Sequence, residues 1–229
     1  MADKELSSAR PTTSSVVAAY DWGALGHVVD VGGGDGMLLI ALLNEYQTLR
    51  GTVVDLPDTA ETARKMLDAA GLANRGDVVA GDFFGALPTG AEGYLLCSVL
   101  HQWQDEDART ILRNCAKAAG EDGALFVIET IPQADHATAP PRTTTPDPAP
   151  NPATAATADE TTAPAADPAT DEPTDPTPDG TTTGAASSPN PGGHARDLTE
   201  LTLLAESAEL TVAAVHTAGT VAILELAVP

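Results

Sequence analysis

Basic residues, cysteines and aromatic residues are all scarce in this sequence. It holds 11 lysines and arginines against 33 acidic residues, which gives a formal net charge of −22. Such a charge repels phosphate groups, so we expect no binding to nucleic acid or to an anionic membrane surface. The two cysteines, Cys97 and Cys115, fall in a predicted strand and a predicted helix. We interpret them as small buried hydrophobic residues, and a reducing cytoplasm fits them better than a disulfide does.

Long apolar runs are also absent. A membrane-spanning helix needs about 20 consecutive apolar residues, and no segment of the chain approaches that length. The first five residues, Met-Ala-Asp-Lys-Glu, lack the apolar centre of a signal peptide. We therefore expect a cytoplasmic protein with no membrane partner. Residues 1–19 are mostly polar, and we expect a flexible tail that ends in a short helix near residues 15–20.

Aromatic residues are missing altogether from residues 133–189. Of the 18 prolines, 14 lie between Pro132 and Pro191, mixed with threonine, alanine and acidic residues. Such a segment cannot bury enough apolar surface to offset the entropy lost on ordering, so we expect a disordered insert. The 38 residues that follow Pro191 are too few for an independent fold. Residues 190–229 are therefore expected to complete the domain that residues 20–132 begin.

What the sequence does contain is a regular alternation of short apolar strands with helical patterns. Five strands alternating with helices are predicted at residues 27–31, 51–55, 77–80, 94–99 and 124–130. After the insert, a helix precedes two further strands at residues 210–215 and 220–226, which residues 216–219 connect. Short connections in this order predict right-handed crossovers. The expected fold is α/β, a three-layer αβα sandwich with a seven-stranded, mostly parallel sheet.

Aspartates mark the expected starts of three helices. Asp58 and Asp197 are each followed three residues later by a glutamate, Glu61 and Glu200, which is the spacing of a capping box. Asp105 precedes another helical pattern and is predicted to cap it. The helix after the first strand is expected to run from about Asp35 to Tyr46.

The first strand leads directly into clustered glycines. Residues 28–36 read Val-Val-Asp-Val-Gly-Gly-Gly-Asp-Gly, and a helical apolar pattern follows. Glycines let the backbone turn sharply and let a ligand approach it closely. The N-terminus of the following helix would direct N–H groups at the same place. This order is typical of a nucleotide-binding βαβ unit, and a bare turn is the alternative.

Five residues with useful chemistry each end or follow one predicted parallel strand: Gly32, Asp55, Asp82, His101 and Glu129. In such sheets, ligands bind beyond the carboxyl ends of the strands. A carboxylate at Asp55 can accept hydrogen bonds from ribose hydroxyls, and Asp82 can accept one from an adenine amino group. The His101 imidazole can take a proton near neutral pH, and Glu129 can orient it.

Each of these residues also has a purely structural interpretation. Asp55 could cap the following helix, and Asp82 could stabilise a turn after glycine. His101 could bond the backbone at the start of a helix, and Glu129 could be a solvated strand end.

Aromatic rings and histidines complete the candidate site residues. Phe83 and Trp103 are expected against the face of an adenine ring. The histidines at positions 27, 136, 194 and 216 are scattered, and no pair has the spacing of metal ligands. We therefore expect no metal site.

Together these motifs resemble S-adenosylmethionine-dependent O-methyltransferases. The resemblance is carried by residues 30–36, 55–57, 81–84 and 99–103, and it resumes at residues 190–196. It is to the branch shared by plant phenolic enzymes and by bacterial enzymes that tailor polyketide antibiotics, including the anthracycline methyltransferases.

The resemblance implies a Rossmann-like class I methyltransferase fold and S-adenosyl-L-methionine as the cofactor. It implies an aromatic or polyketide hydroxyl as the acceptor, His101 as the general base and Glu129 as one of two carboxylates beside it. The cofactor-binding residues assigned on this basis are Gly32, Gly34, Asp55, Asp82, Phe83, Cys97 and Trp103.

The sequence departs from the family pattern in three ways. Ala195 stands where the second carboxylate beside the histidine belongs. Cys97 stands where many relatives place lysine or serine near the cofactor. The N-terminal helical domain, through which family members usually form homodimers and wall the acceptor pocket, is expected to be missing, and the insert replaces a helix that contacts the substrate.

These departures leave other functions open. One is a relative that binds S-adenosylmethionine but performs other chemistry, as the hydroxylases of this branch do. Another is a non-catalytic cofactor-binding module. A nicotinamide oxidoreductase is a weaker rival, because the sequence supplies no evident site for a hydride acceptor.

Overall fold

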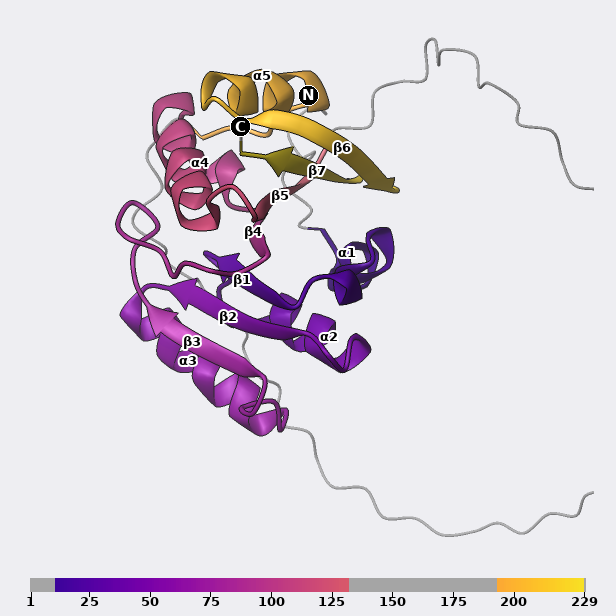
Figure 1. Ribbon diagram of the computed structural model, residues 1–229, viewed down its shortest axis with the longest axis vertical. Helices are drawn as coiled ribbons and strands as arrows, with labels where there is room; N and C mark the ends of the chain where they lie inside the picture. The colour runs from indigo at the N-terminus through magenta and orange to yellow at the C-terminus, as the bar shows by residue number, and fades with distance from the viewer. Residues whose placement is uncertain (1–10, 132–192, 229) are drawn as a thin grey trace, which may run out of the picture. The chain divides into compact units, whose positions relative to one another are not determined.

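The computed structural model describes residues 11–131 and 193–228, whose strands form one seven-stranded sheet in the order β3-β2-β1-β4-β5-β7-β6 (Figure 1). The strands are β1 (His27–Val31), β2 (Arg50–Asp55), β3 (Gly76–Ala80), β4 (Gly93–Cys97), β5 (Ala124–Thr130), β6 (Thr211–Ala218) and β7 (Val221–Ala227). The first five strands pair in parallel, and β7 is antiparallel to both β5 and β6. The predicted seven-stranded, mostly parallel sheet is confirmed.

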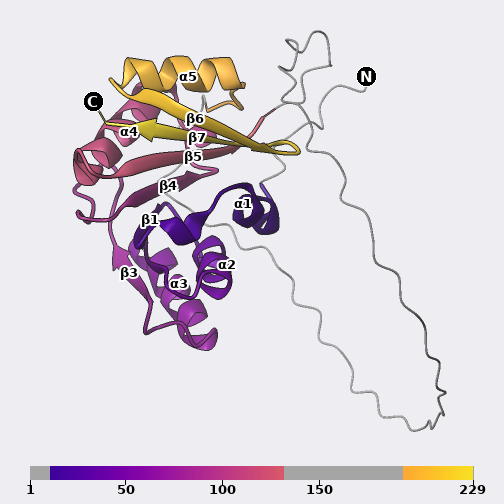
Figure 2. The ribbon, with the colours of Figure 1, turned by 45° about the vertical axis from the view of Figure 1, so that its right-hand side comes forward.

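Helices cover both faces of this sheet (Figure 2). The α-helices are α1 (Thr13–Ala19), α2 (Met37–Glu45), α3 (Pro57–Ala69), α4 (Asp105–Ala119) and α5 (Leu198–Ser207), and two short 3₁₀ turns are η1 (Trp22–Ala24) and η2 (Leu100–Gln102). Buried side chains of α1, α2 and α3 belong to one hydrophobic core, and those of α4 and α5 belong to a second. The three layers of the predicted sandwich are therefore present.

The strands separate the two cores because successive side chains point to opposite faces. Val28 belongs to the core under α2, whereas its neighbour Val29 belongs to the core under α4. Leu95 and Leu96 of β4 divide in the same way. Continuous apolar runs are what a strand buried on both faces requires. None of the helices in the described residues is long and apolar enough to span a membrane.

Two of the three predicted caps are wrong. The N-cap residues of α3 and α4 are Leu56 and Gln104, and neither makes a capping side-chain bond. Asp58 and Asp105 instead lie inside the first turns. Pro57 occupies the first helical position of α3, where its fixed φ favours starting the helix.

The other helix starts follow local chemistry closely. In α5, Asp197 and Glu200 form the predicted capping box, with the Glu200 amide donating to Asp197 Oδ1 at 2.8 Å and the Asp197 amide donating to Glu200 Oε2 at 2.9 Å. Helix α2 begins at Met37, two residues later than predicted. Gly36 before it has a left-handed φ of 80°, which only glycine adopts readily.

Two predicted positions also shift. Strand β6 extends to Ala218, so His216 lies in the strand and not in the connection to β7. Helix α1 is the short helix expected at the end of the N-terminal tail, and it begins two residues earlier than predicted. Its Val16 is buried, and the Trp22 indole N–H donates to the Val16 carbonyl at 3.0 Å. The remainder of that tail and the predicted insert at residues 133–189 lie outside the described residues.

The sheet reverses its direction of growth between β1 and β4. Strands β2 and β3 lie on one side of β1, whereas β5 and β7 lie on the other side of β4. The connection after β1, through α2, leads to β2 on one side, and the connection after β4, through α4, leads to β5 on the other. In open α/β sheets, ligands bind at the carboxyl ends of the two strands where the order reverses in this way. The candidate residues Gly32, Asp55, Asp82, His101 and Glu129 lie at the carboxyl ends of strands β1 to β5, along this edge of the sheet.

Candidate active site

The glycine turn after β1 lies against the turns that follow β3 and β4. Gly32 donates its amide to the carbonyl of Val54 at 2.8 Å and has a φ of +70°. A Cβ at Gly32 would lie 3.1 Å from Val99 Cγ2 and 3.4 Å from Phe83 Cε1. A Cβ at Gly34, whose φ is +62°, would face open space. The turn is thus closed on one side and accessible on the other.

Asp55 links the end of β2 to this turn. Its carboxylate is buried, with Oδ2 accepting from the Gly34 amide at 2.9 Å and Oδ1 accepting from the Leu56 amide at 2.8 Å. An ionised carboxylate offers about four acceptor positions, so it can still accept two more hydrogen bonds. Asp55 precedes the N-cap of α3, and the helix-cap interpretation of this residue is wrong.

Asp30 is a buried acid that sequence reasoning left out of the site. It is 1% exposed in β1, and neither carboxyl oxygen has a hydrogen-bond partner among the described residues. A Cβ at Gly33 would come within 2.6 Å of the Asp30 carboxyl, so the acid lies directly against the glycine turn. Burial, reinforced by the charges of Asp55 and Asp35, raises the pKa of Asp30 to about 7. The sequence does contain a signal for Asp30, because an acidic residue stands there within an otherwise apolar strand.

Asp82 and Phe83 follow β3. Asp82 is exposed, and its Oδ1 accepts from the Phe84 amide at 2.9 Å, so it does stabilise its own turn. The rings of Phe83 and Trp103 meet edge to face at 5.7 Å, and both residues are buried. The Trp103 indole N–H lacks a partner within the described part of the chain. Cys97, partly exposed, ends β4.

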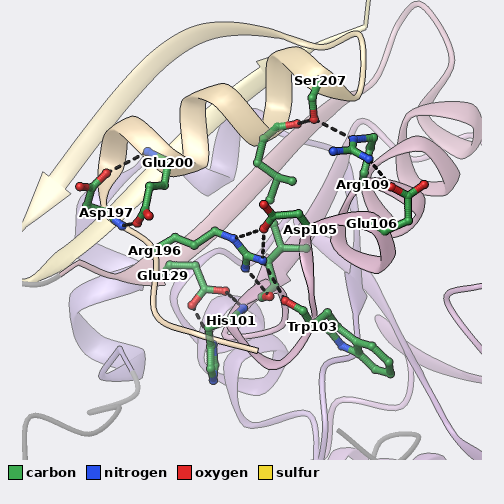
Figure 3. A network of polar contacts seen from close by, with 12 residues as sticks. His101, Trp103, Asp105, Glu106, Arg109, Glu129, Arg196, Asp197, Glu200 and Ser207 are labelled. Atoms are coloured by element: carbon green, nitrogen blue, oxygen red, sulfur yellow. Dashed lines mark hydrogen bonds and ion pairs between the residues drawn. The ribbon is translucent and has the colours of Figure 1, made fainter. Parts of the chain in front are cut away.

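His101 and Glu129 meet at the carboxyl ends of the neighbouring strands β4 and β5. His101 Nδ1 lies 2.9 Å from Glu129 Oε2, and the His101 amide donates to Glu129 Oε1 at 3.3 Å (Figure 3). Glu129 is buried, which contradicts its interpretation as a solvated strand end, whereas a quarter of the His101 side chain is exposed. A carboxylate only accepts hydrogen bonds, so it favours the tautomer with the proton on Nδ1 and a free lone pair on Nε2.

Arg196 is the second residue that sequence reasoning missed. Its side chain is buried and donates to the carbonyls of Leu100 and Trp103, at 2.7 and 2.8 Å. Its Nη2 also lies 2.7 Å from Asp105 Oδ1 (Figure 3). The Arg196 hydrogen bond lowers the pKa of Asp105. An arginine in an acidic sequence was a signal, but nothing local indicated where it packs.

Ala195 lies beside Arg196 and has no polar side-chain atom. Within residues 11–131 and 193–228, Glu129 is the carboxylate that bonds the His101 ring. The same residues contain no group of acids, histidines and cysteines able to hold a metal ion. The arrangement therefore provides one oriented imidazole beside a glycine turn with two buried acids, Asp30 and Asp55.

Comparison with known proteins places these features in a family context. Residues 4–147 match the family model of an O-methyltransferase domain. The chain is 52% identical over 124 residues to 2,7-dihydroxy-5-methyl-1-naphthoate 7-O-methyltransferase of Streptomyces carzinostaticus, covering 54% of this chain and 37% of that protein. It is 50% identical over 111 residues to aclacinomycin 10-hydroxylase of Streptomyces purpurascens, covering 48% of this chain and 30% of that protein.

Solved structures are similar to this chain as well. An O-methyltransferase from neocarzinostatin biosynthesis, crystallised with S-adenosylmethionine and 2-hydroxy-5-methyl naphthoic acid, is 34% identical with a TM-score of 0.66. The likeness covers 94% of this chain and 53% of that one. The chain thus spans about a third to a half of the length of the proteins it matches.

Proposed function

The chain belongs to the O-methyltransferase domain family, and we propose that it binds S-adenosylmethionine and methylates a hydroxyl group of a small aromatic or polyketide molecule. The observation that carries the proposal is the His101–Glu129 pair, which stands at the same sheet edge as the glycine turn. Relatives named for the methylation of naphthoates, and a neighbour crystallised with the cofactor and a naphthoic acid, support this substrate class.

The glycine turn and its acids fit the proposed cofactor. Gly34 faces open space, so the backbone offers a close approach to a ligand. Asp55, held by two backbone amides, keeps acceptor positions for the two ribose hydroxyls. Gly32, Asp82, Phe83, Cys97 and Trp103 are assigned to the same site, because they lie at the carboxyl ends of β1, β3 and β4.

When bound, S-adenosylmethionine supplies an electrophilic methyl group on a positively charged sulfur. His101 Nε2 takes the hydroxyl proton of the acceptor as the acceptor oxygen forms its bond to the methyl carbon and the bond from that carbon to sulfur breaks. Glu129 holds the ring through Nδ1 and stabilises the imidazolium that results. Proton removal of this kind contributes roughly 10²–10⁴-fold to a rate.

Among the residues that the structure describes, one carboxylate, that of Glu129, bonds this imidazole, and Ala195 stands where the family pattern places a second one. We therefore expect cofactor affinity typical of the family together with low turnover. Correct orientation of the reacting groups contributes more to a rate than proton transfer alone. A base that one carboxylate orients is held less firmly than a base between two, so we expect the effect of Ala195 to appear in turnover.

Calorimetric titration tests the cofactor, with S-adenosylmethionine, its demethylated product and NAD as three ligands. We expect binding of the first two and no heat with NAD. Incubation with catechols and hydroxynaphthoates, followed by mass spectrometry, should show products heavier by one methylene unit. Absence of binding to S-adenosylmethionine would overturn the proposal, as would binding of NAD alone.

Oxygen insertion is the second candidate function. It is favoured by the 50% identity to aclacinomycin 10-hydroxylase, which has a different activity from the methyltransferase relatives. The same mass spectra separate the two candidates, because hydroxylation under ¹⁸O₂ adds labelled oxygen and methylation adds none. Binding without either product would indicate a non-catalytic cofactor-binding module.

A further inference from the structure

The short turn that carries His101 is held from outside by a segment distant in the sequence. Arg196 donates to the carbonyl of Leu100, immediately before His101, and to the carbonyl of Trp103, two residues after it. Figure 3 shows its guanidinium beside this turn, opposite the labelled Asp105. One planar side chain thus fixes the backbone on both sides of the histidine.

Gly193 closes on the same turn. A Cβ at this position would collide with the backbone of Gln102 and would lie 2.6 Å from the carbonyl oxygens of His101 and Gln102. Gly193 itself is exposed on its other side. The absence of a side chain lets the segment from Gly193 to Arg196 lie directly on the backbone of the His101 turn.

The geometry of Arg196 is strongly determined. Its side chain is 2% exposed, whereas that of Asp105 is 63% exposed. A buried charge is costly unless it is paired and hydrogen-bonded. Here Nε and Nη2 reach Asp105 Oδ1 while Nη1 and Nη2 reach the two carbonyls. A guanidinium fork can satisfy these contacts in one plane, which a lysine ammonium cannot do.

The turn needs such support at its beginning as well. Ser98 has a φ of +57°, a left-handed conformation that is uncommon for a residue with a side chain. Gln102 Nε2 donates to the Ser98 carbonyl at 2.7 Å. Strained backbone of this kind persists where its surroundings fix it. Glu129 bonds the imidazole and the His101 amide, and Arg196 holds the backbone carbonyls on either side of that residue.

We propose that Arg196 is a positioning residue for His101, and that the segment from Gly193 to Arg196 is the device by which the C-terminal part of the chain sets the imidazole against Glu129. The role of His101 as the base rests on the proposed function. The positioning itself does not, because it concerns contacts within the chain.

Arg196→Lys tests this proposal, with Arg75→Lys as a matched control. Like Arg196, Arg75 donates to backbone carbonyls, here those of Leu43, Tyr46 and Leu49. It lies at the amino end of β3, whereas His101 lies at the carboxyl ends of the strands. Both variants lose a backbone clamp. The readouts are the ¹⁵N resonances of the His101 ring, which report its tautomer, and hydrogen exchange at the His101 amide, which Glu129 protects.

In Arg196→Lys we expect the His101 amide to exchange at least about tenfold faster than in Arg75→Lys, with the ring resonances moving toward a mixture of tautomers. Turnover should fall about 10- to 100-fold through kcat, while cofactor affinity stays within about threefold. If both variants give the same His101 signals and the same kcat, Arg196 is a stabilising clamp only and the proposal is overturned.

Gly193→Ala decides the matter if Arg196→Lys does not fold. The added methyl group must displace the backbone of His101 and Gln102, so the ring resonances and the His101 amide should shift without loss of the fold. Unchanged signals would refute the positioning role. If no acceptor is methylated, these spectra still test the positioning, whereas the mass spectra alone test the proposed activity.

Discussion

At the scale of single residues, Asp30 carries the clearest energetic consequence. Burial raises its pKa from the ordinary 3.8 to about 7 in the folded chain, with Asp55 and Asp35 adding to the effect. The folded state therefore holds this proton more tightly than the unfolded state does. The contribution to stability is fully present below the unfolded pKa, and it is lost as the pH rises toward and through the folded pKa.

Replacing Asp30 with asparagine should remove this pH dependence. Between pH 5 and pH 8 the parent should lose about 2–3 kcal/mol of unfolding free energy that Asp30→Asn retains. Urea denaturation of both proteins at the two pH values measures the difference, and titrating groups elsewhere cancel in it. Parallel pH profiles would show that Asp30 ionises in the folded chain as freely as in the unfolded one.

Asp55 should matter to ligand binding more than its neighbours do. Asp55→Ala leaves the ribose hydroxyls and the Gly34 amide without their acceptor, so S-adenosylmethionine should bind about 1–3 kcal/mol more weakly. Asp58→Ala, an exposed acid in the first turn of α3, is the matched control and should leave affinity unchanged. If calorimetry gives the two variants equal affinities for S-adenosylmethionine, the assignment of Asp55 to the cofactor site is wrong.

At the scale of elements, the caps give a direct comparison between two aspartates. Asp197→Ala removes the side-chain acceptor of the Glu200 amide, one of the two bonds of the α5 capping box, and should lower the unfolding free energy by about 0.5–2 kcal/mol. Asp58→Ala removes a charge near the start of α3 but no capping bond, and should cost less than about 1 kcal/mol. Thermal unfolding of the two variants shows which one loses more stability. A larger loss for Asp58→Ala than for Asp197→Ala would contradict the prediction.

The two failed caps show what local sequence rules omit. The rule that aspartate favours the N-cap is a local one, and at α3 the proline at the first helical position sets the start instead. At α4, the Asp105 carboxylate bonds Arg196, which lies 91 residues further along the chain. Nothing in the local pattern around Asp105 could indicate that partner.

The meeting of His101 with Glu129 could be predicted, because strand ends obey topology. Both residues lie at the carboxyl ends of parallel strands, and β4 and β5 turned out to be neighbours in the sheet. Asp30 and Arg196 could not be placed in the same way. Their importance depends on which polar atoms lack partners and which loop covers them, and both are properties of packing.

At the scale of the whole molecule, the sheet is completed by strands from both sides of residues 132–192. Strand β7 pairs with β5 along its length, from Val221 opposite Thr130 to Ala227 opposite Ala124. The alternation of strands and helices predicted this arrangement. A seven-stranded sheet with covered faces needs partners for β5 that the first part of the chain does not supply.

The composition of residues 133–189 leads to a prediction about stability. We expect that replacing them with a short glycine–serine linker will leave the melting temperature nearly unchanged, because the cost of closing a loop varies slowly with its length. Calorimetry of the shortened and parent chains tests this. A large drop in melting temperature would mean that the segment contributes contacts that its composition does not indicate.

The most direct test of the central claim is methyl transfer by the parent and by His101→Gln at saturating S-adenosylmethionine, followed as labelled methyl groups appearing on hydroxynaphthoates. We predict methylated product from the parent, about 10²–10⁴-fold slower transfer by the variant, and cofactor dissociation constants that agree within about threefold. Equal rates for the two proteins would contradict the account, as would no product from the parent with its cofactor site filled.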